Sequence, residues 1–129
     1  MNMQEDPELR KATDKILKAI EESYGFVPVV NKVMSERPDV FVPYVNFGQS
    51  ILDRTDGAVP RKDRFLLAVS AAAAVGGEHC LRVQIKHARE AGASKDEILE
   101  SILIGSYMSM TRSQSYALRA YADEFDIPY

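Results

Sequence analysis

The sequence has few of the residues that build disulfide frameworks and zinc sites. It contains one cysteine, two histidines and no tryptophan among 129 residues. One cysteine excludes an intramolecular disulfide, and with it a secreted disulfide scaffold. The same count excludes a cysteine-rich zinc site, and two histidines are too few for a conventional one. We therefore expect no metal ion.

Positive charge and long apolar segments are also scarce. The formal net charge is −3, whereas a nucleic-acid-binding protein usually has a basic excess. The longest apolar stretch, residues 65–75, is far shorter than the roughly 20 residues that cross a membrane. The polar, acidic residues 1–6 do not have the pattern of a signal peptide. We therefore predict a soluble cytoplasmic protein that binds neither nucleic acid nor membranes.

What the sequence does contain is a series of helix signals separated by glycine and proline. Hydrophobic residues make up 46% and charged residues 27%, as in ordinary globular proteins. Asp6 and Pro7 predict the start of a first helix, and Gly25 predicts its end. Pro28 opens a short second helix that ends before Pro38.

The middle of the chain predicts two further helices. Proline is tolerated in the first turn of a helix, so Pro43 places the start of the third helix near Val42. A polar loop over residues 53–60 follows. The next helix, residues 61–75, is apolar all round beyond its first turn. Such a helix is buried on most sides, either in its own core or against another subunit.

The C-terminal part predicts two or three helices. One spans residues 78–91, and Ser94 with Glu97 forms a capping box that starts the next. A last helix covers residues 111–125, with a kink or break in the serine-rich junction at 109–115. No alternating strand pattern is present. The sequence therefore predicts a single all-α domain of about six or seven helices over the whole chain of 129 residues.

The most chemically suggestive residue is Cys80, in the first turn of the helix predicted over residues 78–91. Helical spacing places Gln84 and His87 on the same face. The N-terminal turn of a helix favours a thiolate, and a protonated His79 would act in the same direction. His87 lies two turns away, so it acts only through water, substrate or Gln84. A lone cysteine is more often a small buried hydrophobe, and both interpretations stay open here.

Three cations, Arg82, Lys86 and Arg89, lie on the opposite side of the same predicted helix. Their spacing keeps them together on one stripe, because each residue advances by about 100° around the helix axis. The simplest interpretation of such a stripe is a solvated face.

Several segments together carry a family resemblance. They are the Gly-Gly-Glu-His-Cys-Leu turn at 76–81, the Ala-Arg-Glu-Ala-Gly-Ala-Ser segment at 88–94, the Asp-Glu-Ile-Leu-Glu run at 96–100 and Gly-Phe-Val-Pro at 25–28. This order resembles the carboxymuconolactone decarboxylase/alkyl hydroperoxidase D-like family over roughly residues 40–125. The resemblance implies an all-helical, alkyl hydroperoxidase D-like fold without a cofactor. It also implies assembly into homotrimers or homohexamers.

In the peroxidase branch of that family, the resemblance implies a Cys-x-x-Cys pair, a histidine four residues later and a glutamate on the preceding helix. Without gaps, Cys80 matches the second cysteine, while Gly77 stands at the first. Gln84 replaces the histidine, and Phe65 falls where the glutamate is expected. His79 matches a histidine that some members carry. A two-cysteine cycle within one chain is therefore impossible, and an oxidised Cys80 needs an external thiol.

The hypothesis that the sequence favours is a peroxiredoxin-type antioxidant activity, either thiol-dependent peroxidase or disulfide exchange. Its candidate catalytic residues are Cys80, His87, Gln84 and His79. The substrate is then a peroxide, and the second partner is an external thiol reductant.

Two alternatives belong to other functional classes. One is a lyase or isomerase acting on a small carboxylate or lactone metabolite, with Arg82 or Arg112 binding the anion. In that reaction Gln84 cannot serve as the general acid or base. The other alternative is a non-catalytic oligomeric scaffold or ligand-binding member of the family. The residues that bind a substrate are unassigned in each case.

Overall fold

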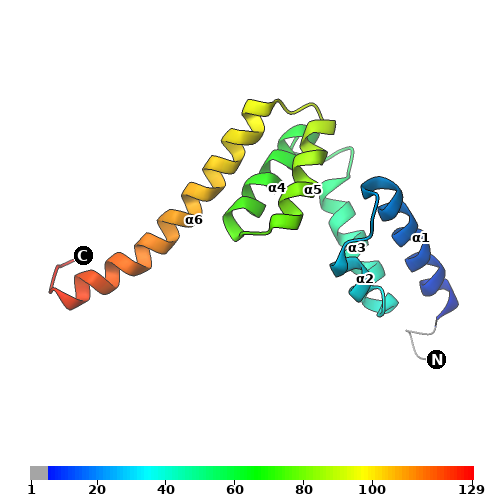
Figure 1. The fold of residues 1–129 in the computed structure, drawn as a ribbon, viewed down its shortest axis with the longest axis horizontal. Coiled ribbons are helices and arrows are strands. Elements are labelled where there is room, and N and C mark those ends of the chain that lie inside the picture. Colours follow the sequence, from blue (N-terminus) through cyan, green and yellow to red (C-terminus); the bar gives the residue numbers. More distant parts are fainter. Residues whose placement is uncertain (1–5) are drawn as a thin grey trace. The chain divides into compact units, whose positions relative to one another are not determined.

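The structure, a computed structural model, describes residues 6–129 of the chain; residues 1–5, which carry most of the signal-peptide prediction, lie outside them. The described residues form six helices and no strand, which confirms the predicted all-α fold (Figure 1). None of these helices is long and apolar enough to cross a bilayer. The chain divides into two compact units at Arg54 and Thr55. The single domain over residues 1–129 stays a prediction.

The first unit is built on helix ends that the sequence predicts. Its elements are α1 (Pro7–Tyr24), α2 (Val29–Met34) and α3 (Pro38–Leu52). The carboxylate of Asp6 accepts a hydrogen bond of 2.9 Å from the backbone N–H of Glu8, which caps α1. Gly25 ends α1 in the left-handed conformation, at φ 80°. Both α1 and α2 pack on α3, and the fully buried side chains there include Thr13 and Phe41.

The start of α3 differs from the prediction, and the expected start near Val42 is wrong. The helix begins at Pro38, where a missing N–H removes no helical hydrogen bond. Arg37 donates hydrogen bonds of 3.0 and 2.7 Å to the carboxylate of Asp39 in this first turn. These hydrogen bonds lower the pKa of Asp39. Pro43 consequently lies inside the helix, where its ring is exposed.

The second unit follows the predicted boundaries except in its last helix. Its elements are α4 (Arg61–Val75), α5 (Glu78–Glu90) and α6 (Lys95–Glu124). The predicted break at residues 109–115 is absent, because α6 runs unbroken for 30 residues. Hydroxyl side chains fit within a helix by bonding back to its carbonyl groups. Thr111 does this, donating a hydrogen bond of 3.0 Å to the carbonyl of Met108.

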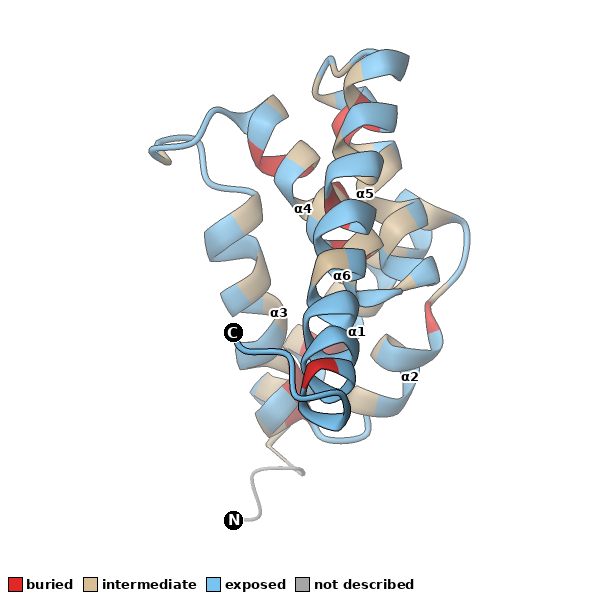
Figure 2. Ribbon diagram, turned by 90° about the vertical axis from the view of Figure 1, so that its left-hand side faces the viewer, coloured by how far each residue is buried: buried red, intermediate tan, exposed pale blue. Residues whose placement is uncertain are grey.

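Only one face of α4 is buried within the chain. Phe65, Val69 and Ala72 recur at helical spacing and form that face (Figure 2). Leu67 on the opposite side is 60% exposed, and Val75 at the C-terminal end of the helix is 83% exposed. The sequence predicts burial of this helix either in the chain's own core or against another subunit. The chain's own core covers just one face of it.

The packing of α4 on α6 depends on a glycine at their crossing. A Cβ atom added to Gly105 of α6 would clash with the carbonyl oxygen of Ser70 on α4. It would also lie 2.9 Å from the carbonyl carbon and 3.0 Å from the hydroxyl oxygen of Ser70. Backbone atoms cannot turn aside as the end of a flexible side chain can. The absence of a side chain at Gly105 thus permits the observed distance between the two helices.

We predict that Gly105→Ala destabilises the fold. Overpacking by one methyl group typically costs about 1–3 kcal/mol, which exceeds the gain of up to about 1 kcal/mol from the better helix propensity of alanine. Urea unfolding followed by circular dichroism measures the change. Gly48→Ala is the matched control, since a Cβ atom at Gly48 on α3 meets nothing within 4 Å. Equal stabilisation by both substitutions would contradict the close crossing.

Candidate functional site

The candidate site centres on the sulfur of Cys80. Cys80 lies in the first turn of α5, and its side chain is exposed. Gly77 precedes this turn as the N-cap residue and has no side chain to accept the first N–H groups. Those N–H groups therefore lie without a side-chain acceptor at the end of the helix where the backbone dipole is positive. Exposure excludes the interpretation of Cys80 as a buried hydrophobe within this chain.

Gln84 and His87 share the face of α5 that carries Cys80, and both are half-buried. The Oε1 atom of Gln84 is buried without a hydrogen-bond partner. Seven residues at about 1.5 Å per residue separate Cys80 from His87 by roughly 10 Å along the axis. Direct hydrogen bonding between the imidazole and the sulfur is therefore excluded, as the sequence predicts.

His87 is held by an aromatic contact with α4. The rings of His87 and Phe65 have their centroids 5.2 Å apart, with planes tilted by 55°. Phe65 is only 1% exposed, and the guanidinium of Arg61 lies over its ring at 5.1 Å. A carboxylate at position 65 would be able to exchange protons with the imidazole, whereas a phenyl ring cannot. The contact therefore fixes the orientation of His87 without forming a proton relay.

His79 is the predicted site residue that the structure keeps apart from the others. It follows Glu78 in the first turn and is exposed. It points about 100° away from Cys80 around the helix axis. Among residues 6–129, no group of three or more His, Cys, Asp or Glu side chains is arranged to hold a metal ion.

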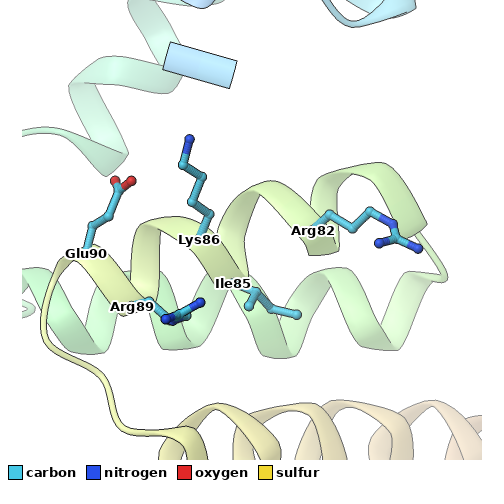
Figure 3. Close-up of a pocket in the computed structure, with 5 residues that line it drawn as sticks. All are labelled: Arg82, Ile85, Lys86, Arg89 and Glu90. Atoms are coloured by element: carbon cyan, nitrogen blue, oxygen red, sulfur yellow. The ribbon is translucent and has the colours of Figure 1, made fainter. Parts of the chain in front are cut away.

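A pocket lies on the other side of α5. It has a volume of about 620 Å³ and is lined by Arg82, Ile85, Lys86, Arg89 and Glu90 (Figure 3). A second pocket of about 460 Å³ shares two of these residues and is lined by Ile85, Arg89, Ala93, Lys95 and Ile98. Cys80, Gln84 and His87 are not among the described residues that line either pocket. The cationic stripe that the sequence predicts as a solvated face is exposed, and it lines this pocket on the side of α5 away from the sulfur.

Gly77 occupies the position where the peroxidase branch would have its first cysteine. A Cβ atom at Gly77 would lie 3.5 Å from the Cβ and 4.0 Å from the Sγ of Cys80. Disulfide-bonded cysteines have Cβ atoms about 3.5–4.5 Å apart. Gly77 also has φ −81°, which any residue adopts without strain. The backbone therefore has the geometry of a Cys-x-x-Cys pair, although the chain has only its second cysteine.

Six helices and a thiol at the start of α5 define an all-α protein with one exposed cysteine. The sequence profile of the carboxymuconolactone decarboxylase family matches residues 38–123, which is more than half of the chain. The chain belongs to the carboxymuconolactone decarboxylase family, which confirms the resemblance in its sequence.

A relative from Paracoccus denitrificans is named "Uncharacterized protein 4 in cox locus". It is 32% identical over 73 residues, which cover 55% of this chain and 66% of that protein. No solved structure matches the chain. The comparisons therefore establish the family of the chain.

We predict that Gly77→Cys forms a disulfide with Cys80. Mild oxidation should lower the intact mass by two hydrogen atoms and remove both thiols from titration, because the two Cβ atoms already lie at bonding distance. Arg82→Cys is the matched control: it also adds one thiol close to Cys80, two residues away in sequence, but on the opposite side of α5. Two thiols that stay free in the Gly77→Cys variant would contradict this geometry.

Proposed function

We propose that this carboxymuconolactone decarboxylase family protein is a one-cysteine, peroxiredoxin-type oxidoreductase that acts through Cys80. The observation that carries the proposal is the exposed thiol in the first turn of α5. An exposed cysteine is reachable by a small substrate, and its thiolate form is the nucleophile that attacks a peroxide.

The proposed reaction consumes one hydroperoxide and two equivalents of an external thiol. The Cys80 thiolate attacks the terminal peroxide oxygen, an S–O bond forms, and the O–O bond breaks. The leaving oxygen takes a proton from water and departs as alcohol or water. The first external thiol displaces the sulfenic hydroxyl as water and forms a mixed disulfide. The second external thiol attacks that disulfide, returns Cys80 to the thiol and leaves as the oxidised external disulfide.

The residues near Cys80 take no direct part in the bond changes at the sulfur. Gln84 cannot exchange a proton, and Phe65 takes the place of an acid beside His87. His87 acts through Gln84, water or substrate, and the exposed His79 adds positive charge near the helix start when it is protonated. The rate then depends mainly on access to the thiolate at the helix terminus.

The proposal extends to the setting of the protein. A free exposed thiol is preserved in the reducing cytoplasm, which also supplies small thiol reductants. We further propose a homotrimer or homohexamer, because two apolar side chains of α4, Leu67 and Val75, are exposed to solvent. Exposed apolar surface of this kind marks contacts between subunits.

The lyase alternative has weaker support from the residues. A lyase for a small carboxylate would need the anion beside a proton-transferring group. The basic pocket of Figure 3 provides the cations, but it lies on the side of α5 away from Gln84 and His87. We therefore retain the thiol proposal.

We predict that hydrogen peroxide adds one oxygen atom to the protein at Cys80. Intact-mass spectrometry with a sulfenic-acid trapping reagent detects the product, and peroxide is consumed continuously when a small dithiol is added. Cys80→Ser should abolish both signals, while Ser50→Ala, an exposed hydroxyl on α3, should change neither. Oxidation no faster than that of free glutathione, with no turnover, would favour the non-catalytic scaffold instead.

We also predict that Gln84→His accelerates peroxide reduction by roughly tenfold or more, since it adds a proton acceptor one helical turn from Cys80. The gain should disappear as the pH falls below about 6.5, where an ordinary imidazole becomes protonated. Stopped-flow measurement of peroxide consumption across this pH range tests both points. Gln49→His on α3 introduces the same group elsewhere and should leave the rate unchanged.

A further inference from the structure

The second half of α6 has no neighbouring helix within its own unit. At about 1.5 Å per residue, the 30 residues of α6 extend roughly 45 Å, while the 15 residues of α4 extend roughly 22 Å. Figure 1 shows the C-terminal half of α6 continuing past the ends of α4 and α5. Residues 112–121 are exposed without exception. We refer to residues 112–127 as the arm.

The arm carries large apolar side chains that face solvent. Tyr116, Leu118, Tyr121 and Phe125 are all exposed, and the rings of Tyr121 and Phe125 are in contact, with centroids 4.7 Å apart. Aromatic side chains supply much of the binding energy at protein interfaces. A helix gains most of its stability from packing an apolar face, so the arm has the composition of a helix that packs on a partner.

The tip of the arm is acidic, whereas the pocket on α5 is basic. Asp123, Glu124 and Asp126 carry three carboxylates at the end of the arm, and residues 120–129 contain no lysine or arginine. Asp123 also accepts a hydrogen bond of 2.9 Å from the hydroxyl of Tyr129. Three cations, Arg82, Lys86 and Arg89, line the pocket together with one carboxylate, that of Glu90 (Figure 3). Arg82 also forms an exposed ion pair of 3.2 Å with Glu78, and the excess of charge in the pocket is positive. The two surfaces are complementary in charge.

The acidic tip cannot reach the basic pocket of its own chain. Asp123 lies about 42 Å along the helix axis from Lys95, where α6 begins. Arg89 is joined to that same beginning by a short connection and lines a pocket with Lys95. The 13 residues of α5 extend only about 20 Å. The acidic tip is therefore farther from the start of α6 than any residue of α5 is, and a continuous helix cannot fold back. Any contact between the tip and the pocket thus joins two chains.

We propose that the arm of one copy docks on α5 of a second copy, with its acidic tip in the basic pocket lined by Arg82, Lys86 and Arg89. This contact specifies an interface for the proposed oligomer. It is independent of the chemistry of Cys80, which lies on the opposite side of α5. The apolar residues of the arm supply buried area, and the charges fix which surfaces meet.

Sedimentation velocity of the full chain and of charge-reversal variants tests the interface. An arm variant carries Asp123→Lys, Glu124→Lys and Asp126→Lys, and a pocket variant carries Arg82→Glu, Lys86→Glu and Arg89→Glu. Each should raise the dissociation constant at least about tenfold, because like charges then face each other. The variant with all six substitutions should assemble again, since its charges are exchanged and not lost.

The matched control reverses three exposed acids of α1: Glu8→Lys, Asp14→Lys and Glu21→Lys. It should assemble like the unmodified protein. Circular dichroism of every variant separates misfolding from loss of assembly. Raising the salt from 0.1 M to 1 M should weaken association, because the screening length falls from about 10 Å to about 3 Å.

Three results would overturn the proposed contact. They are a monomeric unmodified protein at about 100 µM, arm and pocket variants that assemble normally, and a six-substitution variant no better than either parent. Peroxide oxidation of Cys80, measured separately by mass, identifies whether the interface or the thiol proposal has failed.

Discussion

The second unit depends on the close approach of α4 and α6 where Gly105 faces the backbone of Ser70. A side chain at position 105 would push the helices apart. The buried face of α4, which includes Phe65 and Val69, would then lose its cover. Because α5 packs mainly on α4, the position of the face that carries Cys80 depends on how α4 packs against α6. The absence of a side chain at Gly105 is thus needed both for the packing of the core and for the position of the candidate site.

Helix ends that depend on residues of their own turn are predictable from the sequence, whereas ends that depend on competing signals are not. Asp6 and Gly25 act on their own turns, so the sequence alone places α1 correctly. The start of α3 was missed because two prolines compete for the first turn, and the ion pair at Arg37 favours the earlier one. The unbroken α6 was missed because serine-rich segments suit loops and exposed helix equally.

Which residues share the face of Cys80 follows from the sequence, whereas the surroundings of that face do not. Helical spacing places Cys80, Gln84 and His87 on one face of α5, since one face of a helix is a property of the chain alone. Their catalytic role stays a prediction. What covers that face is decided by other helices. The exposure of Cys80 and the ring contact of His87 with Phe65 therefore required the structure. Likewise, the glycine at 77 reads as a lost cysteine, yet the backbone there retains disulfide geometry.

The thiol proposal and the docking proposal are compatible because they use opposite sides of α5. Arg89 lies nine residues from Cys80, which is a rotation of about 180° on an ideal helix, and Arg82 and Lys86 lie within about 60° of Arg89. A partner bound along that cationic side would leave the sulfur exposed at the start of the helix. The partner would pack on α5 on the side away from the sulfur, while α4 packs on α5 within the chain. A copy that lacks this contact would keep the sulfur exposed as well, so the proposed oxidation of Cys80 does not require assembly.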